Sequence, residues 1–399
     1  MDRPDQLIGR QGNGLSDLLG GSRIPASATG VLAVDLDAII RNYRKLRMQA
    51  HFAECAAVMK ANGYGLGAVE VSAALAANGC NSFFVATVAE GAKLRRALPD
   101  GIIYVLDGLL PGSASDFKDA RLRPVLNGIG ETEEWSNYCR SIGQKLPAAI
   151  HFDTGMNRLG LKVSGQQRLA EHLEILSGFT PSLLMSHLAC ADTPESVKNA
   201  EQLRRFGEYF QKLPVMPLSL ANSAGIFLGA DYCFDLVRPG IALYGGNPLS
   251  GEANPMEPVV TLYGRIAQLG QAQEGETIGY GAARTLKRPT RFATVTAGYA
   301  DGYFRSLGST DSKPGATAYI GNWRLPVLGR VSMDLIAIDI TDTPSGAVER
   351  GGFVELLGKN FTVDDAAKAA GTIPYEILTG IGQRYNRVYL QSGGMGPSM

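Results

Sequence analysis

Residues 58–67 read VMKANGYGLG, and this stretch points both to a kind of strand and to a kind of site. The run before it, AECAAVM, has the length of a buried strand, yet the strand closes on the charged side chain of Lys60. Glycines let the backbone approach a ligand closely, and an amine held at a strand end loses solvation, which lowers its pKa. Such a lysine can form a Schiff base with an aldehyde. The alternative reading is a lysine that extends its amine into water before a flexible turn.

Seven further apolar runs follow the first, with helical segments between them. The eight strand candidates are CAAVMK, FFVATV, IIYVLDG, RPVLN, AAIHFD, LLMSHLA, LSLAN and LVRPGIA. Eight strands alternating with helices favour a (β/α)8 barrel of the TIM type over an open doubly wound sheet. The chemistry of such barrels lies at the carboxyl ends of the strands. These runs end on the polar residues Lys60, Asp107, Asn127, Asp153, His187, Asn222, Ser223 and Arg238.

The residue composition of the chain changes after about residue 250. Runs such as VVTLYGRIAQL and ATVTAGYADGYF are rich in Val, Ile, Thr and Tyr with glycine between them, which predicts a domain made mainly of strands. One helix is expected there, in TVDDAAKAAG, with Thr362 as N-cap and Gly371 near the C-cap. The predicted organisation is a flexible extension over residues 1–28, the barrel over 29–246 and a mainly β C-terminal domain over 247–399.

Composition excludes several classes of function. The 399 residues carry 38 Lys plus Arg and 38 Asp plus Glu, and no basic stripe stands out, so nucleic acid is not an expected partner. The five cysteines are scattered without a CxxC, which indicates neither a disulfide framework nor a zinc or other metal site. No segment has the apolar length of a signal peptide core or a membrane span. We therefore expect a cytoplasmic protein with no membrane partner.

Two positions of the first half of the barrel suit ligand binding. Tyr64 lies four residues after Lys60 across the glycine turn, so both side chains can face one ligand. Arg158, in HFDTGMNRLG, follows a strand end, where its guanidinium can hold a carboxylate or form a surface ion pair with Asp153 or a neighbour. His187, which ends LLMSHLA among apolar neighbours, is more typical of a satisfied core histidine than of a catalyst.

The later strands offer polar caps and a buried cation. Asn222 and Ser223 precede a helix start, which suits anion binding and is equally explained by capping. Arg238 lies in the apolar strand LVRPGIA and needs an acceptor, while Gly240 offers backbone N–H groups to a phosphate. In the C-terminal part, Tyr280 stands between glycines in IGYGAART.

The order of these segments resembles that of the alanine racemase family, fold-type III enzymes that use pyridoxal 5'-phosphate (PLP). The resemblance covers residues 30–392 and rests on VMKANGYGLG, DTGMNRLG, MSHLACAD, ANSAG, VRPGIALYG, GYGA, GYADGY and GRVSMD. It implies a cytoplasmic homodimer with shared active sites that interconverts L- and D-alanine, providing D-alanine for peptidoglycan or handling alanine in catabolism. The alternatives are a racemase with wider specificity that includes serine, an amino-acid decarboxylase of the same fold type, or a PLP-binding protein without catalytic activity.

The resemblance also implies a role for each matching residue. Lys60 resembles the lysine that holds PLP covalently and acts as one catalytic base, and Tyr280 resembles the second base, from the C-terminal domain of the other subunit. The other matching residues are Tyr64, Ser223, Gly240 and Ile241 at the phosphate, Arg238 at the pyridine nitrogen, His187 and Asn222 beside the cofactor, and Arg158 and Met333 at the substrate carboxylate.

Three positions depart from the commonest family pattern. His151 stands where many members have a carbamylated lysine that orients the arginine, so the negative partner of Arg158 must be something else. Gln383 stands where many members have a phosphate-binding tyrosine, and Leu66 replaces the usual histidine of the glycine turn.

Overall fold

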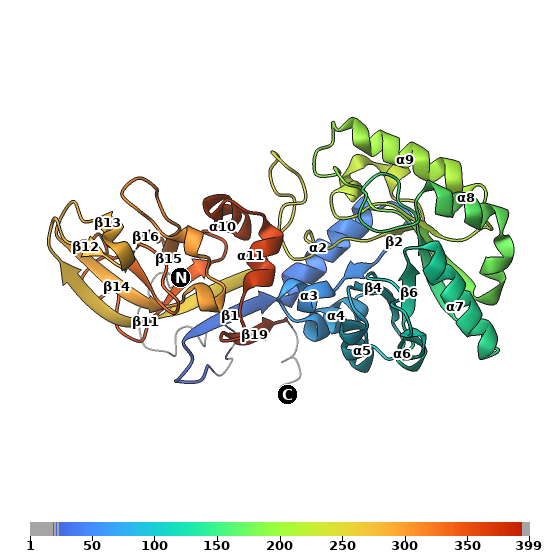
Figure 1. Ribbon diagram of the computed structural model, residues 1–399. Helices are drawn as coiled ribbons and strands as arrows, with labels where there is room; N and C mark the ends of the chain where they lie inside the picture. Colours follow the sequence, from blue (N-terminus) through green and yellow to red (C-terminus); the bar gives the residue numbers. More distant parts are fainter. Residues whose placement is uncertain (1–18, 20, 22–23, 393–399) are drawn as a thin grey trace. The chain divides into compact units, whose positions relative to one another are not determined.

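The chain forms two compact units in the computed structural model, which describes residues 19, 21 and 24–392 (Figure 1). One unit consists of residues 39–257, and the other combines the residues before 39 with those from 258 onward. The extension predicted over residues 1–28 lies mostly outside the described residues.

The unit of residues 39–257 is built on parallel strands in sequence order. Seven of them form one sheet, ordered β3-β4-β5-β6-β7-β8-β9, and β10 pairs with β2 in parallel. Their bounds are β2 (Glu54–Cys55), β3 (Ala57–Val58), β4 (Ser82–Val85), β5 (Ile102–Val105), β6 (Arg123–Leu126), β7 (Pro147–His151), β8 (Thr180–Met185), β9 (Leu218–Ser219) and β10 (Leu236–Val237). Their side chains are buried almost throughout, as expected for strands covered on both faces.

Backbone hydrogen bonds close this sheet into a ring. The Arg238 N–H donates to the Ala221 carbonyl at 3.0 Å, which joins the segment of β10 to that of β9. On the other side, the Val58 N–H donates to the Pro239 carbonyl, also at 3.0 Å. The predicted (β/α)8 barrel is therefore confirmed, and the strand ends converge at one mouth.

Helices follow the strands and lie around the outside of the barrel (Figure 1). They are α2 (Leu36–Gln49), α4 (Ala68–Ala76), α5 (Val88–Ala97), α6 (Ala114–Asp119), α7 (Ile129–Ser141), α8 (Val163–Glu171) and α9 (Val197–Phe210). The short segment α3 (Lys60–Tyr64) follows β3 and is a turn with positive φ values rather than a regular helix. Helix α5 begins where the Thr87 side chain accepts the Glu90 N–H at 3.2 Å, an N-cap that fixes the start of the helix.

The other unit is mainly β, as the sequence predicts. Its sheet is ordered β14-β17-β16-β15-β18-β11-β1-β19, and a further pairing of β11 with β14 closes six of these strands into a barrel that leaves none of the six as an open edge. Its elements are β1 (Gly30–Asp35), β11 (Val260–Ala272), β12 (Thr277–Ile278), β13 (Arg284–Thr285), β14 (Thr290–Thr296), β15 (Thr317–Ile320), β16 (Trp323–Leu328), β17 (Ile336–Asp339), β18 (Phe353–Leu357), β19 (Asn386–Leu390), α10 (Val363–Ala370) and α11 (Pro374–Gly380).

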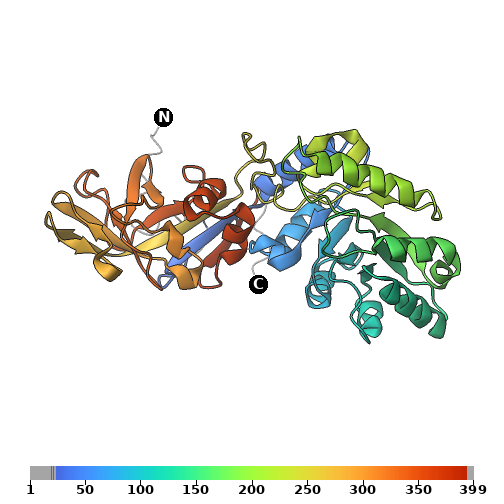
Figure 2. The same cartoon turned by 45° about the horizontal axis from the view of Figure 1, so that its top comes forward.

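Two details of this unit bear on the sequence predictions. The strand Gly30–Asp35 falls within the range predicted for the TIM-type barrel, but it pairs with β11 and β19 and so belongs to the β unit (Figure 2). The predicted helix is present as α10, where Thr362 and Asp365 form a capping box and Gly371 adopts the left-handed C-cap conformation. Within the described part of the chain, no helix combines the length and the apolar character that crossing a membrane requires.

Candidate active site

The lysine singled out by the sequence begins an unusual turn directly after β3. Ala61, Asn62 and Tyr64 have φ values of 53°, 56° and 53°, so α3 is a left-handed turn, and glycine occupies only part of it. A non-glycine residue in this conformation costs about 1–2 kcal/mol. Backbone strain of this kind concentrates at functional sites, where the surrounding structure holds it in place.

The amine of Lys60 is largely buried and lies near one cation and two carboxylates. Burial and the nearby guanidinium of Arg158 lower the pKa of Lys60 below its usual value, while Asp107 and Glu90 act in the opposite direction. A lowered pKa increases the fraction of neutral amine near neutral pH, which is the form that attacks a carbonyl group and removes a proton.

Ser223 and the segment after β10 form a cluster of neutral donors. The Ser223 Oγ accepts the N–H groups of Gly240 at 2.8 Å and of Ala242 at 3.3 Å, so its own hydroxyl proton is directed elsewhere. The N–H of Ile241 lies between them in a fully buried residue and donates to none of the described residues. An oxyanion bound here would accept hydrogen bonds from these unpaired donors.

Tyr64 brings its hydroxyl to the same place. A Cβ atom added to Gly240 would lie only 2.2 Å from the Tyr64 Oη. The Tyr64 ring stacks on Tyr244 with centroids 4.6 Å apart, and the Tyr244 hydroxyl donates to the Val58 carbonyl at 2.9 Å. Tyr64 is therefore held from behind by a partner that sequence reasoning did not identify, although its position in the VRPGIALYG motif could have indicated it.

The side chain of Arg238 is buried inside the barrel. Its guanidinium donates to the Ser219 hydroxyl, to the Ser186 carbonyl at 2.5 Å and, more weakly, to the His187 Nδ1 at 3.5 Å. All three acceptors are neutral, so the charge of Arg238 is not cancelled by a carboxylate. Burial and this charge lower the pKa of His187 well below its usual value, so the imidazole is neutral and its proton resides on Nε2. His187 thus lies beside charged site residues, which favours a site role over that of a core histidine.

His151 is also neutral. Its Nδ1 lies 2.7 Å from the Asn127 Oδ1, and Asn127 donates from Nδ2 to the Leu106 carbonyl, so the histidine is the donor of the pair. Burial and the charges of Arg238 and Arg158 lower the pKa of His151 to about 3. His151 therefore provides no negative charge for Arg158, as expected from its side chain.

Arg158 stands in a loop shaped by Asp153. One carboxylate oxygen of Asp153 accepts the N–H groups of Gly155 at 2.8 Å and Met156 at 2.9 Å, and the other pairs with Lys162. The alternative pairing of Arg158 with Asp153 is therefore wrong, because Lys162 occupies that carboxylate. Arg158 has no ion pair or hydrogen bond with any described residue, so its guanidinium is available to a carboxylate.

Asn222 fits the capping interpretation of its position. Its Oδ1 accepts the Gly225 N–H at 2.9 Å at the start of a 3-10 turn over Gly225–Leu228. A bridge pairs its backbone with that of Arg238, so Asn222 still lies at the mouth of the barrel.

The remaining candidates lie in the β unit. Tyr280 is 68% exposed in a tight turn where Gly281 has a φ of 70°, and a Cβ at that glycine would lie 2.8 Å from the Arg330 guanidinium. The Met333 carbonyl accepts the Ala300 N–H at 3.0 Å, and the Met333 side chain is 53% exposed. Gln383 is one of the positions that depart from the commonest family pattern. It precedes Arg384, which pairs with Asp301 and Asp334 within this unit.

The residues at the barrel mouth fit both the phosphate and the aldehyde of PLP. The unpaired donors at Ser223 and Ile241 suit a phosphate group, and the Lys60 amine with its lowered pKa suits an aldehyde. A single small molecule that carries both groups satisfies the arrangement, and the close approach of Tyr64 to Gly240 explains why no side chain is present there. The fold and this mouth together define a PLP-dependent enzyme of the barrel type.

Comparisons with known proteins agree with this class. Residues 34–248 match the alanine racemase N-terminal domain model, and residues 259–389 match the C-terminal domain model. A catabolic alanine racemase from Mesorhizobium japonicum is 47% identical over 92% of this chain and 94% of the relative. A biosynthetic alanine racemase from Agrobacterium fabrum is 46% identical over 90% of this chain and 93% of the relative.

A solved structure extends the similarity to three dimensions. The crystal structure of alanine racemase from Bartonella henselae with covalently bound pyridoxal phosphate superposes with a TM-score of 0.86, at 38% identity, over 91% of this chain and 100% of that one. The chain belongs to the alanine racemase family, whose members depend on PLP.

Proposed function

We propose that this chain interconverts L- and D-alanine with Lys60 and Tyr280 as the two residues that move the α-proton. Racemisation needs one group to remove the proton from Cα on one face and another to return it on the opposite face. Bound PLP supplies the electron sink that makes the Cα proton acidic. The observation that carries the proposal is the strained turn that sets the amine of Lys60, with its lowered pKa, beside the unpaired Arg158.

The other residues hold and orient the cofactor and the substrate. Ser223, Ile241 and Tyr64 are the proposed phosphate contacts, and the Arg158 guanidinium, with the backbone of Met333, is the proposed contact for the alanine carboxylate. Arg238 can only donate, so it favours an unprotonated pyridine nitrogen. That preference limits the electron sink, which favours return of the proton over transamination. A decarboxylase of the same fold type would instead offer this nitrogen a carboxylate.

Arg158 is the proposed centre of anion binding beside the substrate. Since His151 is neutral and no described carboxylate pairs with this guanidinium, a bound anion or a water molecule is the proposed replacement for the family's carbamate.

We further infer that the working unit is a cytoplasmic homodimer with shared sites. Tyr280, Tyr299 and Met333 are all more than 40% exposed in the β unit, which suits a surface that meets a partner. All five cysteines are unpaired, in keeping with a reducing compartment. Because catabolic and biosynthetic relatives are similarly close, the proposal concerns the reaction and leaves its metabolic direction open.

Proton exchange at Cα tests the proposed chemistry. Purified protein loaded with PLP and incubated with L-alanine in D2O should place deuterium on Cα and form D-alanine, without releasing CO2. Tyr280→Phe should slow exchange more for one enantiomer than for the other, because each base serves one face. Equal slowing for both enantiomers would contradict the two-base assignment, and release of CO2 would indicate the decarboxylase. Serine offered as substrate tests the wider specificity.

A further inference from the structure

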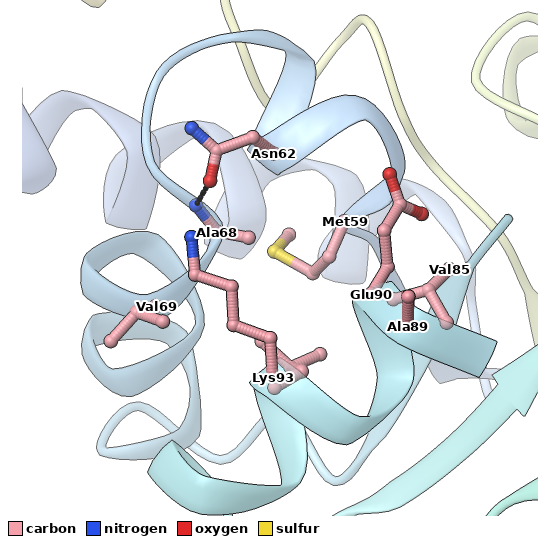
Figure 3. A pocket seen from close by; sticks show the side chains of 9 residues that line it. Met59, Asn62, Ala68, Val69, Val85, Ala89, Glu90 and Lys93 are labelled. Carbon is pink, nitrogen blue, oxygen red and sulfur yellow. Dashed lines mark hydrogen bonds between the residues drawn. The ribbon is translucent and has the colours of Figure 1, made fainter. Parts of the chain in front are cut away.

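The turn that carries Lys60 is not supported by packing on its outer side. A cavity of about 280 Å³ lies behind it, and Met59, Asn62 and Ala68 of the turn region line this cavity together with Glu90 and Lys93 of α5 (Figure 3). A left-handed turn of non-glycine residues relaxes unless its surroundings hold it. Elsewhere Tyr64 stacks on Tyr244, and within the turn the Gly63 N–H donates to the Met59 carbonyl at 2.8 Å. On the side that faces the cavity side chains do not fill the space, so hydrogen bonds hold the turn there.

Glu90 supplies the hydrogen bonds that do so from outside the turn. One of its carboxylate oxygens accepts the Ala61 N–H at 2.7 Å, and the other accepts the Ala86 N–H at 2.8 Å. Ala61 follows Lys60 directly, and Ala86 follows β4, so the carboxylate joins two neighbouring loops of the barrel mouth. Hydrogen bonds to an ionised acceptor are about twice as strong as neutral ones. A further hydrogen bond joins the turn to the start of α4, where the Asn62 Oδ1 accepts the Ala68 N–H at 3.3 Å (Figure 3).

The same device occurs a second time in the barrel, away from Lys60. Glu131 occupies the third position of α7, as Glu90 does in α5, and it accepts the N–H of the residue four positions before it, Asn127, at 2.9 Å. It also accepts the Leu109 N–H, at 3.2 Å, from the loop that follows the preceding strand. Both of these N–H groups donate to Oε2 of Glu131, whereas Glu90 uses both of its oxygens. Glu90 and Glu131 therefore both link two neighbouring loops, and only the link of Glu90 reaches the lysine turn.

Glu90 also contributes charge to the surroundings of Lys60. The charged and titratable groups that face the Lys60 amine are Arg158, Asp107, Glu90 and His187, and His187 is neutral. Glu90 raises the pKa of Lys60 and so opposes burial and Arg158. Removing its charge therefore lowers the pKa of the amine, while removing its hydrogen bonds loosens the turn.

We propose that Glu90 is a positioning residue that holds the left-handed turn after β3, and through it the Lys60 amine, in the conformation required at the barrel mouth. This inference rests on the role proposed for Lys60. Its hydrogen-bond component concerns the turn alone and can be measured without cofactor or turnover.

Three variants separate the two contributions of Glu90. Glu90→Gln removes the charge, and its single carbonyl oxygen satisfies only one of the two N–H groups, while its amide nitrogen opposes the other. Glu90→Asp keeps the charge but is one methylene too short to link both loops. Glu131→Ala is the matched control, since it removes both hydrogen bonds of the corresponding link at the same helix position.

Hydrogen–deuterium exchange of the cofactor-free chain measures the link. The Ala61 amide should exchange about tenfold faster or more in Glu90→Gln and Glu90→Asp, because a hydrogen bond to a charged group is worth at least that factor. In Glu131→Ala the Ala61 amide should exchange at the wild-type rate while that of Leu109 accelerates, because both hydrogen bonds of Glu131 are lost. An unchanged Ala61 amide in both Glu90 variants would overturn the proposal, as would equal acceleration in the control, which would indicate a general loss of stability.

The pH dependence of lysine modification measures the charge. The rate at which acetic anhydride modifies Lys60 in the cofactor-free chain, followed by peptide mapping, gives the pKa of this amine. The pKa should fall in Glu90→Gln and stay near the wild-type value in Glu90→Asp and Glu131→Ala, whereas PLP affinity should fall about tenfold in both Glu90 variants. An unchanged pKa in Glu90→Gln would overturn the charge contribution. Failure of racemase activity in the wild-type chain would contradict the proposed function and leave the exchange result intact.

Discussion

Gly240→Ala should disrupt the proposed phosphate site through a contact that the structure defines. The new Cβ would lie 2.2 Å from the Tyr64 Oη and 2.9 Å from the Tyr64 Cζ, well inside van der Waals contact. Tyr64 cannot yield easily, because it is only 5% exposed and stacks on Tyr244. Overpacking of this kind costs about 1–3 kcal/mol, and here it moves Tyr64 or the backbone donors beside Ser223. PLP affinity should therefore fall by about 10- to 100-fold.

Fluorescence titration of the cofactor-free chain with PLP gives this affinity. The matched control is Gly207→Ala, because Gly207 lies inside α9 and a Cβ there meets no atom within 4 Å. That substitution should leave PLP affinity unchanged and stabilise the fold by about 0.5–1 kcal/mol, as alanine does in a helix interior. Wild-type PLP affinity in Gly240→Ala would refute the reasoning that Tyr64 and Gly240 together form the cradle.

Three further outcomes follow from the site. Protein purified with PLP should be yellow, and borohydride should fix the cofactor to Lys60; a peptide map with the label on another residue would end this assignment. Arg158→Ala should raise the KM for alanine by about 10- to 100-fold with unchanged PLP absorbance, since a hydrogen bond to a charged group is lost; an unchanged KM would remove Arg158 from the substrate site. The pKa of His151 falls from 6.5 to about 3 on folding, so its contribution to stability is complete above pH 6.5 and is lost as the pH falls toward 3. His151→Asn should therefore reduce the slope of unfolding free energy against pH by about 1.4 kcal/mol per unit between pH 4 and 6, measured by urea unfolding; an unchanged slope would contradict the neutral histidine.

Much of the barrel could be predicted because each strand is a short apolar run that ends on a polar residue. That pattern located Lys60, His187 and Arg238 at one mouth before any contact was known. The pattern says nothing about which strands pair, however, and the run Gly30–Asp35 has the same apolar character as the barrel strands. Its pairing with β11 depends on residues more than two hundred positions later, which a local pattern cannot reveal.

The parts of the site that the sequence did not reveal depend on contacts between loops. Glu90 appears in the sequence as an ordinary first-turn acid of a helix, and only the fold brings its carboxylate to the Ala61 N–H. The pairing of Asp153 with Lys162, which leaves Arg158 available, is a choice between two nearby cations that spacing does not decide. The left-handed turn is likewise unexpected at Ala61 and Tyr64, because neither is a glycine or an asparagine.

Mixed refolding of two inactive variants tests most directly whether Lys60 and Tyr280 from different subunits form one active site. Lys60→Ala and Tyr280→Phe chains are unfolded together, refolded with PLP and assayed for racemisation, and mass measurement establishes that mixed dimers have formed. Random pairing makes about half of the dimers mixed, and each mixed dimer has one intact site of two, so activity should return to roughly a quarter of the wild-type value. Activity that stays at the level of the separate variants, although mixed dimers are present, would contradict the shared two-base site.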